Sequence, residues 1–254
     1  MILTIDHGEV REVRMNRPPV NALTGDLLRD LRLAIQAATH SKVRALILSG
    51  LPGKFCAGLD LPFLLTQDRE AITNLWRELY GAVQAIACSP IPIAAAITGH
   101  APAGGTVLSM FCDWRVMADG DFRLGLNEVQ VGIPLPKIAF VGLRRLVGER
   151  YAERLGVEGR MITAKDALQI GLVDELTPLD QVIPRALGWC DGLLSLPSEA
   201  MLITRRGARA DMLSYFERGL ESEIETAIAS WWTPEAQKTM TTVVNRMKSK
   251  KAAQ

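Results

Sequence analysis

One acidic residue is a candidate for chemistry because of the residues around it. Glu128 lies in the segment "LGLNEVQVGI", in which most neighbours are aliphatic: Leu124, Leu126, Val129, Val131 and Ile133. A carboxylate in such surroundings loses hydration, which favours its neutral form and moves its pKa toward the range in which a general base works. The alternative is that Glu128 ends a strand and points into solvent.

Two adjacent glycines are a second candidate feature. Gly104 and Gly105 lie in "GHAPAGGTVL", where one apolar run ends and another begins. A helix that begins there has free backbone N–H groups and a positive dipole end, and glycine lets a ligand approach closely. The segment is neither a P-loop nor a dinucleotide-binding fingerprint. Close packing between a strand and a helix is the other explanation for these glycines.

A second glycine-containing loop, "GKFCAGLD", follows the apolar run "VRALILSG". Two such loops after neighbouring strands could aim two N–H groups at one point. That arrangement is what an oxyanion site requires, with donors about 2.7–3.1 Å from the developing negative charge. The sequence therefore indicates acid–base chemistry beside a stabilised oxyanion.

The elements that position these residues follow from the hydrophobic pattern. Residues 2–15 predict two strands around a turn at His7 and Gly8, and Thr24 or Asp26 can cap the helix that follows. Helices and strands then alternate, which predicts a mixed α/β fold with crossover connections. From about Ala139 onward the pattern is mostly helical, and residues 248–254 are expected to fray. The expected strands are 43–50, 91–99, 113–119 and 122–128, and the expected helices are 25–40, 69–89, 103–112, 222–231 and 235–249.

Composition limits the classes of protein that fit. The 254 residues suit one large domain, or one domain with a small appendage. Lys plus Arg number 29 and Asp plus Glu number 28, so the basic excess typical of a nucleic-acid binder is absent. The sequence contains no run of about 18 or more apolar residues, so no membrane span is predicted. The N-terminal segment lacks the pattern of a signal or transit peptide, so we expect a cytoplasmic protein.

The cysteines predict neither disulfides nor a metal site. Cys56, Cys88, Cys112 and Cys190 form no C-x-x-C pair and have no zinc-site spacing. We expect four reduced thiols that are buried as small apolar side chains.

Five segments in order resemble the crotonase family, the enoyl-CoA hydratase/isomerase superfamily, over nearly the whole chain. The resemblance implies an α/β fold, a crotonase-like spiral of repeated β-β-α units over residues 1–195. A C-terminal helical trimerisation region over residues 196–254 would follow, with assembly as a homotrimer or a dimer of trimers. The segments are "NRPPVNALT", "FCAGLDL", "GHAPAGGTVLSMFCDWRVMAD", "LGLNEVQVGI" and "ITAKDALQIGLVDEL".

The same resemblance implies roles for individual residues. The backbone N–H groups of Leu59 and Gly104 would bind the thioester oxygen of an acyl-CoA, and Glu128 would be the catalytic base. Asn127 could orient that carboxylate or make a turn. Coenzyme A is part of the substrate, so no separate cofactor is expected. The residues expected to bind substrate are Ala57, Gly58, Leu59, Asp60, Leu61, Gly104 and Asn127.

One substitution distinguishes members of this family. The resemblance implies that a hydratase of this family uses two glutamates, one at the position of Glu128 and one three residues after the glycine of the second oxyanion loop. In this chain the latter position is Val107. The chain is most similar to the 3,2-trans-enoyl-CoA isomerase branch, which implies conversion of 3-enoyl-CoA to 2-trans-enoyl-CoA in fatty acid metabolism. The alternatives are a hydratase that uses Glu128 alone and a non-catalytic acyl-CoA-binding protein. Pro136 stands where the family's dienoyl-CoA isomerases have an aspartate, which argues against that branch.

Several other polar and aromatic residues allow two interpretations each. His100 could contact ligand or stabilise a turn, and Asp113 is expected to cap or turn between a helix and a strand. Trp231 and Trp232 could cover the acyl pocket or pack in the core or at an interface. Six cations could reach coenzyme A phosphates or lie on solvated helix faces: Arg205, Arg206, Arg209, Lys248, Lys250 and Lys251.

Overall fold

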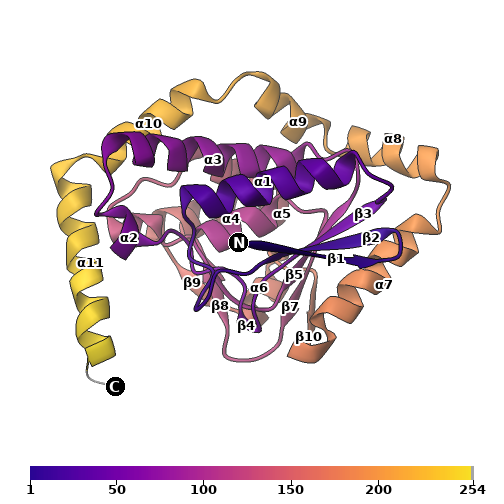
Figure 1. The fold of residues 1–254 in the computed structure, drawn as a ribbon, viewed down its shortest axis with the longest axis horizontal. Coiled ribbons are helices and arrows are strands. Elements are labelled where there is room, and N and C mark those ends of the chain that lie inside the picture. Colours follow the sequence, from indigo (N-terminus) through magenta and orange to yellow (C-terminus); the bar gives the residue numbers. More distant parts are fainter. Residues whose placement is uncertain (253–254) are drawn as a thin grey trace.

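The computed structural model describes residues 1–252, and over this part of the chain the strands form two sheets (Figure 1). The strands are β1 (Ile2–His7), β2 (Val10–Met15), β3 (Ala45–Ser49), β4 (Gly53–Lys54), β5 (Ile93–Ile97), β6 (Gly99–Pro102), β7 (Trp114–Ala118), β8 (Arg123–Gly125), β9 (Met161–Thr163) and β10 (Glu175–Thr177). The larger sheet has the order β1-β2-β3-β5-β7-β10, and the smaller has the order β4-β6-β8-β9. Only the β1–β2 and β8–β9 pairs among these are antiparallel.

Helices fill most of the remaining chain, and a side chain caps the start of several of them. The Thr24 side chain accepts a hydrogen bond from the Leu27 N–H and caps α1, so Thr24 rather than Asp26 is the cap. The α-helices are α1 (Gly25–Thr39), α2 (Leu61–Leu64), α3 (Arg69–Ala87), α4 (Gly104–Met110), α5 (Lys137–Glu158), α6 (Ala164–Gln169), α7 (Val182–Leu194), α8 (Ser198–Ala208), α9 (Ala210–Glu217), α10 (Glu221–Trp231) and α11 (Pro234–Ala252), and the 3-10 helices are η1 (Glu128–Val131) and η2 (Leu179–Gln181).

The chain repeats one path several times. A strand of the larger sheet is followed by a strand of the smaller sheet and then by helix, as in β3–β4–α3, β5–β6–α4 and β7–β8–α5. The predicted spiral of β-β-α units is therefore confirmed. Because each unit advances both sheets by one strand, the loops after successive strands are stacked beside one another.

The central strands β3 and β5 of the larger sheet are buried on both faces, as crossover connections require. Alternate residues of β5 show this: Ala94 and Ala96 face α7, whereas Ile93 and Ile97 belong to the main core. On the main-core side α1 packs against α3. In Figure 1 the helices α8, α9 and α10 arch over α3 and α1, and α11 descends along one side. Among the helices of residues 1–252, none has the length and apolar character needed to cross a bilayer.

Some local predictions were wrong. The strand expected at 122–128 ends at Gly125, which adopts a φ of 143°, and Glu128 begins η1 instead. The strands β4, β6, β9 and β10 were not predicted, because two to four residues are too few to show alternation. The expected fraying of residues 248–254 is not seen up to Ala252, where α11 ends, and residues 253–254 lie outside the described chain. Cys88 is exposed, whereas the other three cysteines are buried, and all four are free thiols.

Candidate active site

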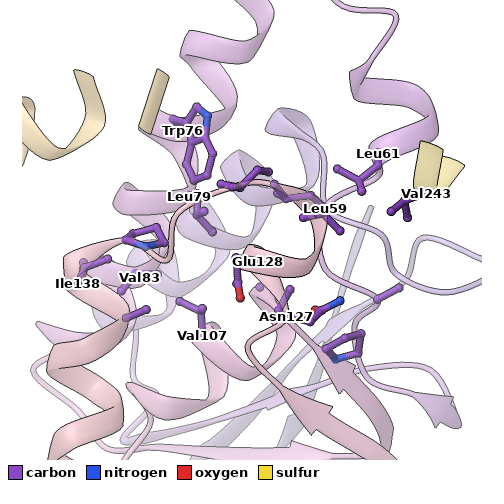
Figure 2. A pocket seen from close by; sticks show the side chains of 18 of the residues that line it. Leu59, Leu61, Trp76, Leu79, Val83, Val107, Asn127, Glu128, Ile138 and Val243 are labelled. Carbon is purple, nitrogen blue, oxygen red and sulfur yellow. The ribbon is translucent and has the colours of Figure 1, made fainter. Parts of the chain in front are cut away.

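An apolar cavity of about 240 Å³ lies where the loops after β4 and β6 meet η1. Its walls come from α2, α3, α4, η1, the start of α5 and the middle of α11. Figure 2 shows Trp76, Leu79 and Val83 of α3 on one side of Glu128, with Leu61 and Val243 on the other. Elements far apart in sequence therefore enclose a single space around one carboxyl group.

Glu128 faces this cavity and is only 9% exposed. Burial raises the pKa of Glu128 to about 7, although a hydrogen bond with its own backbone N–H opposes the shift. Its Oε2 is buried, and no atom of residues 1–252 is hydrogen-bonded to it. The apolar interpretation is thus confirmed and the solvent-facing alternative is wrong. A carboxyl group with this pKa exists in both protonation states near neutral pH, as a proton carrier must.

The backbone around η1 holds Glu128 in place. The Ile133 N–H donates to the Glu128 carbonyl oxygen at 3.0 Å, and η1 ends at Gly132 in a left-handed conformation with a φ of 82°. A Cβ on Gly132 would lie 3.1 Å from the Ala236 Cα of α11. Glycine at this position therefore allows α11 to pack directly against the turn that carries the carboxylate.

The two glycine-containing loops touch each other at the edge of the cavity. A Cβ added to Gly58 would lie 3.0 Å from the Ala103 Cβ and 3.6 Å from the Gly104 nitrogen. A Cβ added to Gly105 would lie 2.8 Å from the Cys56 carbonyl oxygen. The glycines are therefore required for the close approach of the loops. The packing explanation holds for Gly105 and also for Gly104, where a Cβ would lie 2.5 Å from the Leu23 Cδ1, and Gly58 has the same role in the other loop.

Two backbone donors remain free where these loops meet. The N–H groups of Ala57 and Asp60 donate to the carbonyl oxygens of Val20 and Leu23, at 3.1 and 3.0 Å. Between them, the Leu59 N–H has no hydrogen-bond partner within residues 1–252, and neither has the Gly104 N–H at the start of α4. Both residues line the cavity. Unpaired backbone donors beside an apolar cavity are suited to an oxyanion or another acceptor supplied by a ligand.

Val107 lies one turn into α4 and lines the same cavity, with 6% of its surface exposed. Its neighbour Thr106 is buried between α4 and the smaller sheet: its hydroxyl donates to the Ala101 carbonyl of β6 and accepts from the Gly125 N–H of β8. Among the described residues that line the cavity, Glu128 is the only one with a carboxyl group.

The predicted substrate-binding residues separate into two groups. Ala57, Leu59, Leu61, Gly104 and Asn127 line the cavity. Gly58 does not line the cavity; it lies where its loop contacts Ala103 of the other loop. Asp60 is also outside: it accepts from the Phe63 N–H as the cap of α2 and pairs with Arg17 at 2.8 Å.

Asn127 lines the cavity and is also part of the turn that leads into η1. Its carbonyl oxygen accepts from the Gln130 N–H at 3.0 Å, so its main chain forms the turn into η1. Its side-chain Oδ1 is buried and has no partner in the part of the chain described. The turn role is therefore supported, and an amide oxygen remains available at the cavity.

The sequence did not place several wall residues. Trp76 and Tyr80 come from α3, Ile138 from α5, and Val243 and Met247 from α11. The apolar faces of these helices were visible as periodicity. Periodicity shows that a face is covered, but it does not show whether the core or a ligand cavity covers it.

The remaining candidates lie elsewhere. Arg205 and Arg209 donate to the Asp113 carboxylate at 2.8 and 2.9 Å, so they join α8–α9 to the core and neither predicted role applies to them. Asp113 lies in the bend between α4 and β7, as the turn interpretation predicts, and its carboxylate accepts from the Ile93 N–H of β5 rather than capping a helix. His100 lies in β6 and does not line the cavity; its ring accepts from the Arg123 N–H at 3.1 Å, where the loop before β8 ends, so it stabilises that loop rather than contacting ligand.

The two tryptophans and the other cations are also away from the cavity. Trp231 is 1% exposed in the core, and Trp232 stacks under the Arg69 guanidinium. Arg206 and Lys248 are exposed on helices. The side chains of Lys250 and Lys251 lie outside the described part of the chain.

Comparisons with known proteins agree with this geometry. Residues 6–250 match the family described as enoyl-CoA hydratase/isomerase. The chain is 30% identical over 252 residues to "Enoyl-CoA delta isomerase 1, mitochondrial" of Homo sapiens, covering 95% of this chain and 81% of that one. It is 33% identical over 194 residues to "Probable enoyl-CoA hydratase EchA17" of Mycobacterium tuberculosis, covering 76% and 74%.

The fold has a similarly extensive match. The crystal structure of human mitochondrial delta3-delta2-enoyl-CoA isomerase superposes with a TM-score of 0.92 at 28% identity, covering 98% of this chain and 99% of that one. An enoyl-CoA hydratase from Bacillus halodurans superposes with a TM-score of 0.86 at 23% identity, over 95% and 99%, which is a likeness of fold alone.

Proposed function

This chain belongs to the enoyl-CoA hydratase/isomerase family, and on that premise we propose that it is an acyl-CoA double-bond isomerase. The proposed reaction converts a 3-enoyl-CoA into the conjugated 2-trans-enoyl-CoA. The observation that supports it most directly is the single carboxyl group in the cavity, with Val107 in place of a second one. Moving a proton within one substrate needs one carrier, whereas placing and activating a water is helped by two.

The proposed mechanism has two proton transfers. The Glu128 carboxylate takes a proton from C2 of the 3-enoyl thioester, and the electron pair of that C–H bond delocalises over C2–C4 and the thioester oxygen. The N–H groups of Leu59 and Gly104 donate to this oxygen and stabilise the dienolate. The Glu128 carboxylic acid then returns the proton to C4, which leaves a double bond between C2 and C3. Atoms and charge balance without water, metal or electron acceptor.

The cavity walls support isomerisation over hydration. Val107, Trp76 and Leu79 surround Glu128 with apolar groups, and such walls exclude the water that would compete for the dienolate. Relatives named as hydratases are as similar in sequence as those named as isomerases. Hydration is therefore the alternative that the experiment has to separate.

Several broader features belong to the same proposal. We propose a core domain over residues 1–195, a helical trimerisation region over 196–254, and a homotrimer or a dimer of trimers. A cytoplasmic location and a reaction without metal or cofactor are also proposed. Treatment with EDTA followed by gel filtration tests the last point, and full retention of activity is expected.

A two-substrate assay tests the proposed activity. The protein is incubated with 3-hexenoyl-CoA and, separately, with crotonyl-CoA, and the ultraviolet absorbance of the conjugated enoyl thioester is followed. We expect a rise with the first and no loss with the second. Rapid loss with crotonyl-CoA would identify a hydratase. Tight binding of acyl-CoA without turnover of any enoyl thioester would identify a binding protein.

A further inference from the structure

Two cavities of the molecule share a wall. The first is the apolar cavity beside Glu128, and the second, called here the outer cleft, is a hollow of about 530 Å³ between α5 and the α9–α10 turn. Adjacent residues of α5 face different sides: Ala139 lines the apolar cavity, whereas Phe140 lines the outer cleft. The two spaces therefore lie against neighbouring faces of the same helix.

Three polar side chains complete the wall. Tyr80 of α3 lines the apolar cavity, whereas Tyr215 of α9 and Glu223 of α10 line the outer cleft. The Tyr215 hydroxyl donates to the Glu223 Oε1. Helix α10, which carries Glu223, packs against α3, which carries Tyr80. Burial raises the pKa of Tyr80, and the Glu223 carboxylate raises it further, in keeping with this packing. These three residues are called the Tyr80–Glu223–Tyr215 cluster.

The cluster is packed but incompletely bonded. Tyr80 is 2% exposed, so its ring closes the apolar cavity on this side. The Glu223 Oε2 is buried, and within residues 1–252 it has no hydrogen-bond partner. A buried acceptor without a donor weakens the local structure relative to a fully bonded one. Moving Glu223 aside therefore breaks no hydrogen bond of this oxygen.

We propose that the Tyr80–Glu223–Tyr215 cluster is a gate that limits the length of the acyl chain, with Tyr80 as the specificity-determining residue. The inference rests on the proposed function, in which the apolar cavity holds the acyl chain. With the gate closed, the chain ends against the Tyr80 ring. Removing the ring joins the apolar cavity to the outer cleft, and a longer straight chain passes between α5 and α10.

If the cluster is a gate, the affinity for acyl-CoA should rise with acyl-chain length only up to a certain length. Each methylene group buried in an apolar site increases affinity by about fourfold, and a methylene that meets a wall gives no increase. The dissociation constants of saturated acyl-CoAs should therefore fall with chain length up to a limit and then stop falling. Replacing a wall residue by alanine should move that limit to longer chains.

The test measures dissociation constants by calorimetry for saturated acyl-CoAs from four to sixteen carbons. Tyr80→Ala removes the side of the wall that faces the apolar cavity, and Glu223→Ala removes the side that faces the outer cleft. If one of these variants does not fold, the other still tests the gate. Glu225→Gln is the matched control, because Glu225 is an exposed residue of the same helix. We expect the limit to move by about four carbons in each alanine variant, through burial of further methylenes, and to stay in place in the control.

The outcomes separate the gate from the proposed function. Saturated acyl-CoAs have no double bond to move, so their binding reports the shape of the cavity whether or not the protein is an isomerase. Length profiles of both alanine variants that match the wild-type profile would overturn the gate. A shift in Glu225→Gln equal to that in Glu223→Ala would overturn it as well. Failure of the two-substrate assay would instead overturn the proposed function.

Discussion

A Cβ atom on Gly58 would lie 3.6 Å from the backbone nitrogen of Gly104, so the two loops that carry the free N–H groups are in direct contact. This contact fixes the separation of the two donors. It depends on a residue without a side chain, because the same Cβ would also lie 3.0 Å from the Ala103 Cβ. Gly58 therefore contributes to the proposed oxyanion site without lining the cavity.

Gly58→Ala should lower kcat/KM for 3-hexenoyl-CoA by about 100-fold, because the added methyl group pushes the two donors apart. Gly53→Ala is the matched control. Gly53 has a φ of 76°, close to the 75° of Gly58, but a Cβ there would contact nothing within 4 Å. Both variants carry the same backbone strain, so only Gly58→Ala should lose activity beyond any loss of stability. Equal kcat/KM values in the two variants would contradict this role of the loop contact.

Val107→Glu should introduce hydration. A second carboxyl group at this position would face the same cavity as Glu128 and could help to hold a water molecule. We expect the rate of crotonyl-CoA hydration to exceed that of Val107→Gln by at least about tenfold, as a general acid or base contributes. The glutamine variant controls for polarity and size. Equal hydration rates in the two variants would show that the absence of a carboxylate at position 107 is not what separates isomerisation from hydration.

The pH dependence of activity should follow Glu128. The reaction begins with the carboxylate form, and burial raises the pKa of Glu128 to about 7. The value of kcat/KM should therefore rise with pH through about 7 and fall tenfold per pH unit well below it. A profile that stays flat down to pH 5.5 would indicate a base with an ordinary carboxyl pKa, contrary to the burial of Glu128.

The same pKa shift predicts a pH-dependent difference in stability between the wild type and Glu128→Gln. The native protein holds the Glu128 proton up to about pH 7, whereas the unfolded chain releases it near 4.5. The wild type therefore loses up to about 3 kcal/mol of unfolding free energy as pH rises from 4.5 to 7, and the glutamine variant does not. Urea unfolding at pH 5 and pH 8 measures this. A stability difference that is equal at both pH values would contradict it.

Much of the site was predictable because its signals are local in sequence. The apolar neighbours of Glu128 lie within five residues of it, and each glycine-containing loop directly follows its strand. The alternation of helices and strands then indicated that these loops would stand side by side.

The parts that were not predicted depend on contacts between distant residues. Arg205 meets Asp113 across 92 positions, and Met247 of α11 reaches a cavity formed mostly by the first 139 residues. Hydrophobic periodicity identifies a buried face but not its partner. Single residues such as Asp60 were also ambiguous, because an aspartate after a glycine-containing loop can cap a helix or face a ligand, and here it caps α2.

In the proposed mechanism one carboxyl group carries one proton from C2 to C4 in a cavity that excludes water. The most direct measurement uses 3-hexenoyl-CoA with two deuterium atoms at C2, converted in ordinary water and analysed by mass spectrometry and NMR. We expect product with deuterium at C4, delivered by Glu128 from the same substrate molecule. Product that carries only solvent hydrogen at C4 would contradict it, because the proton would then come from water or from a second group.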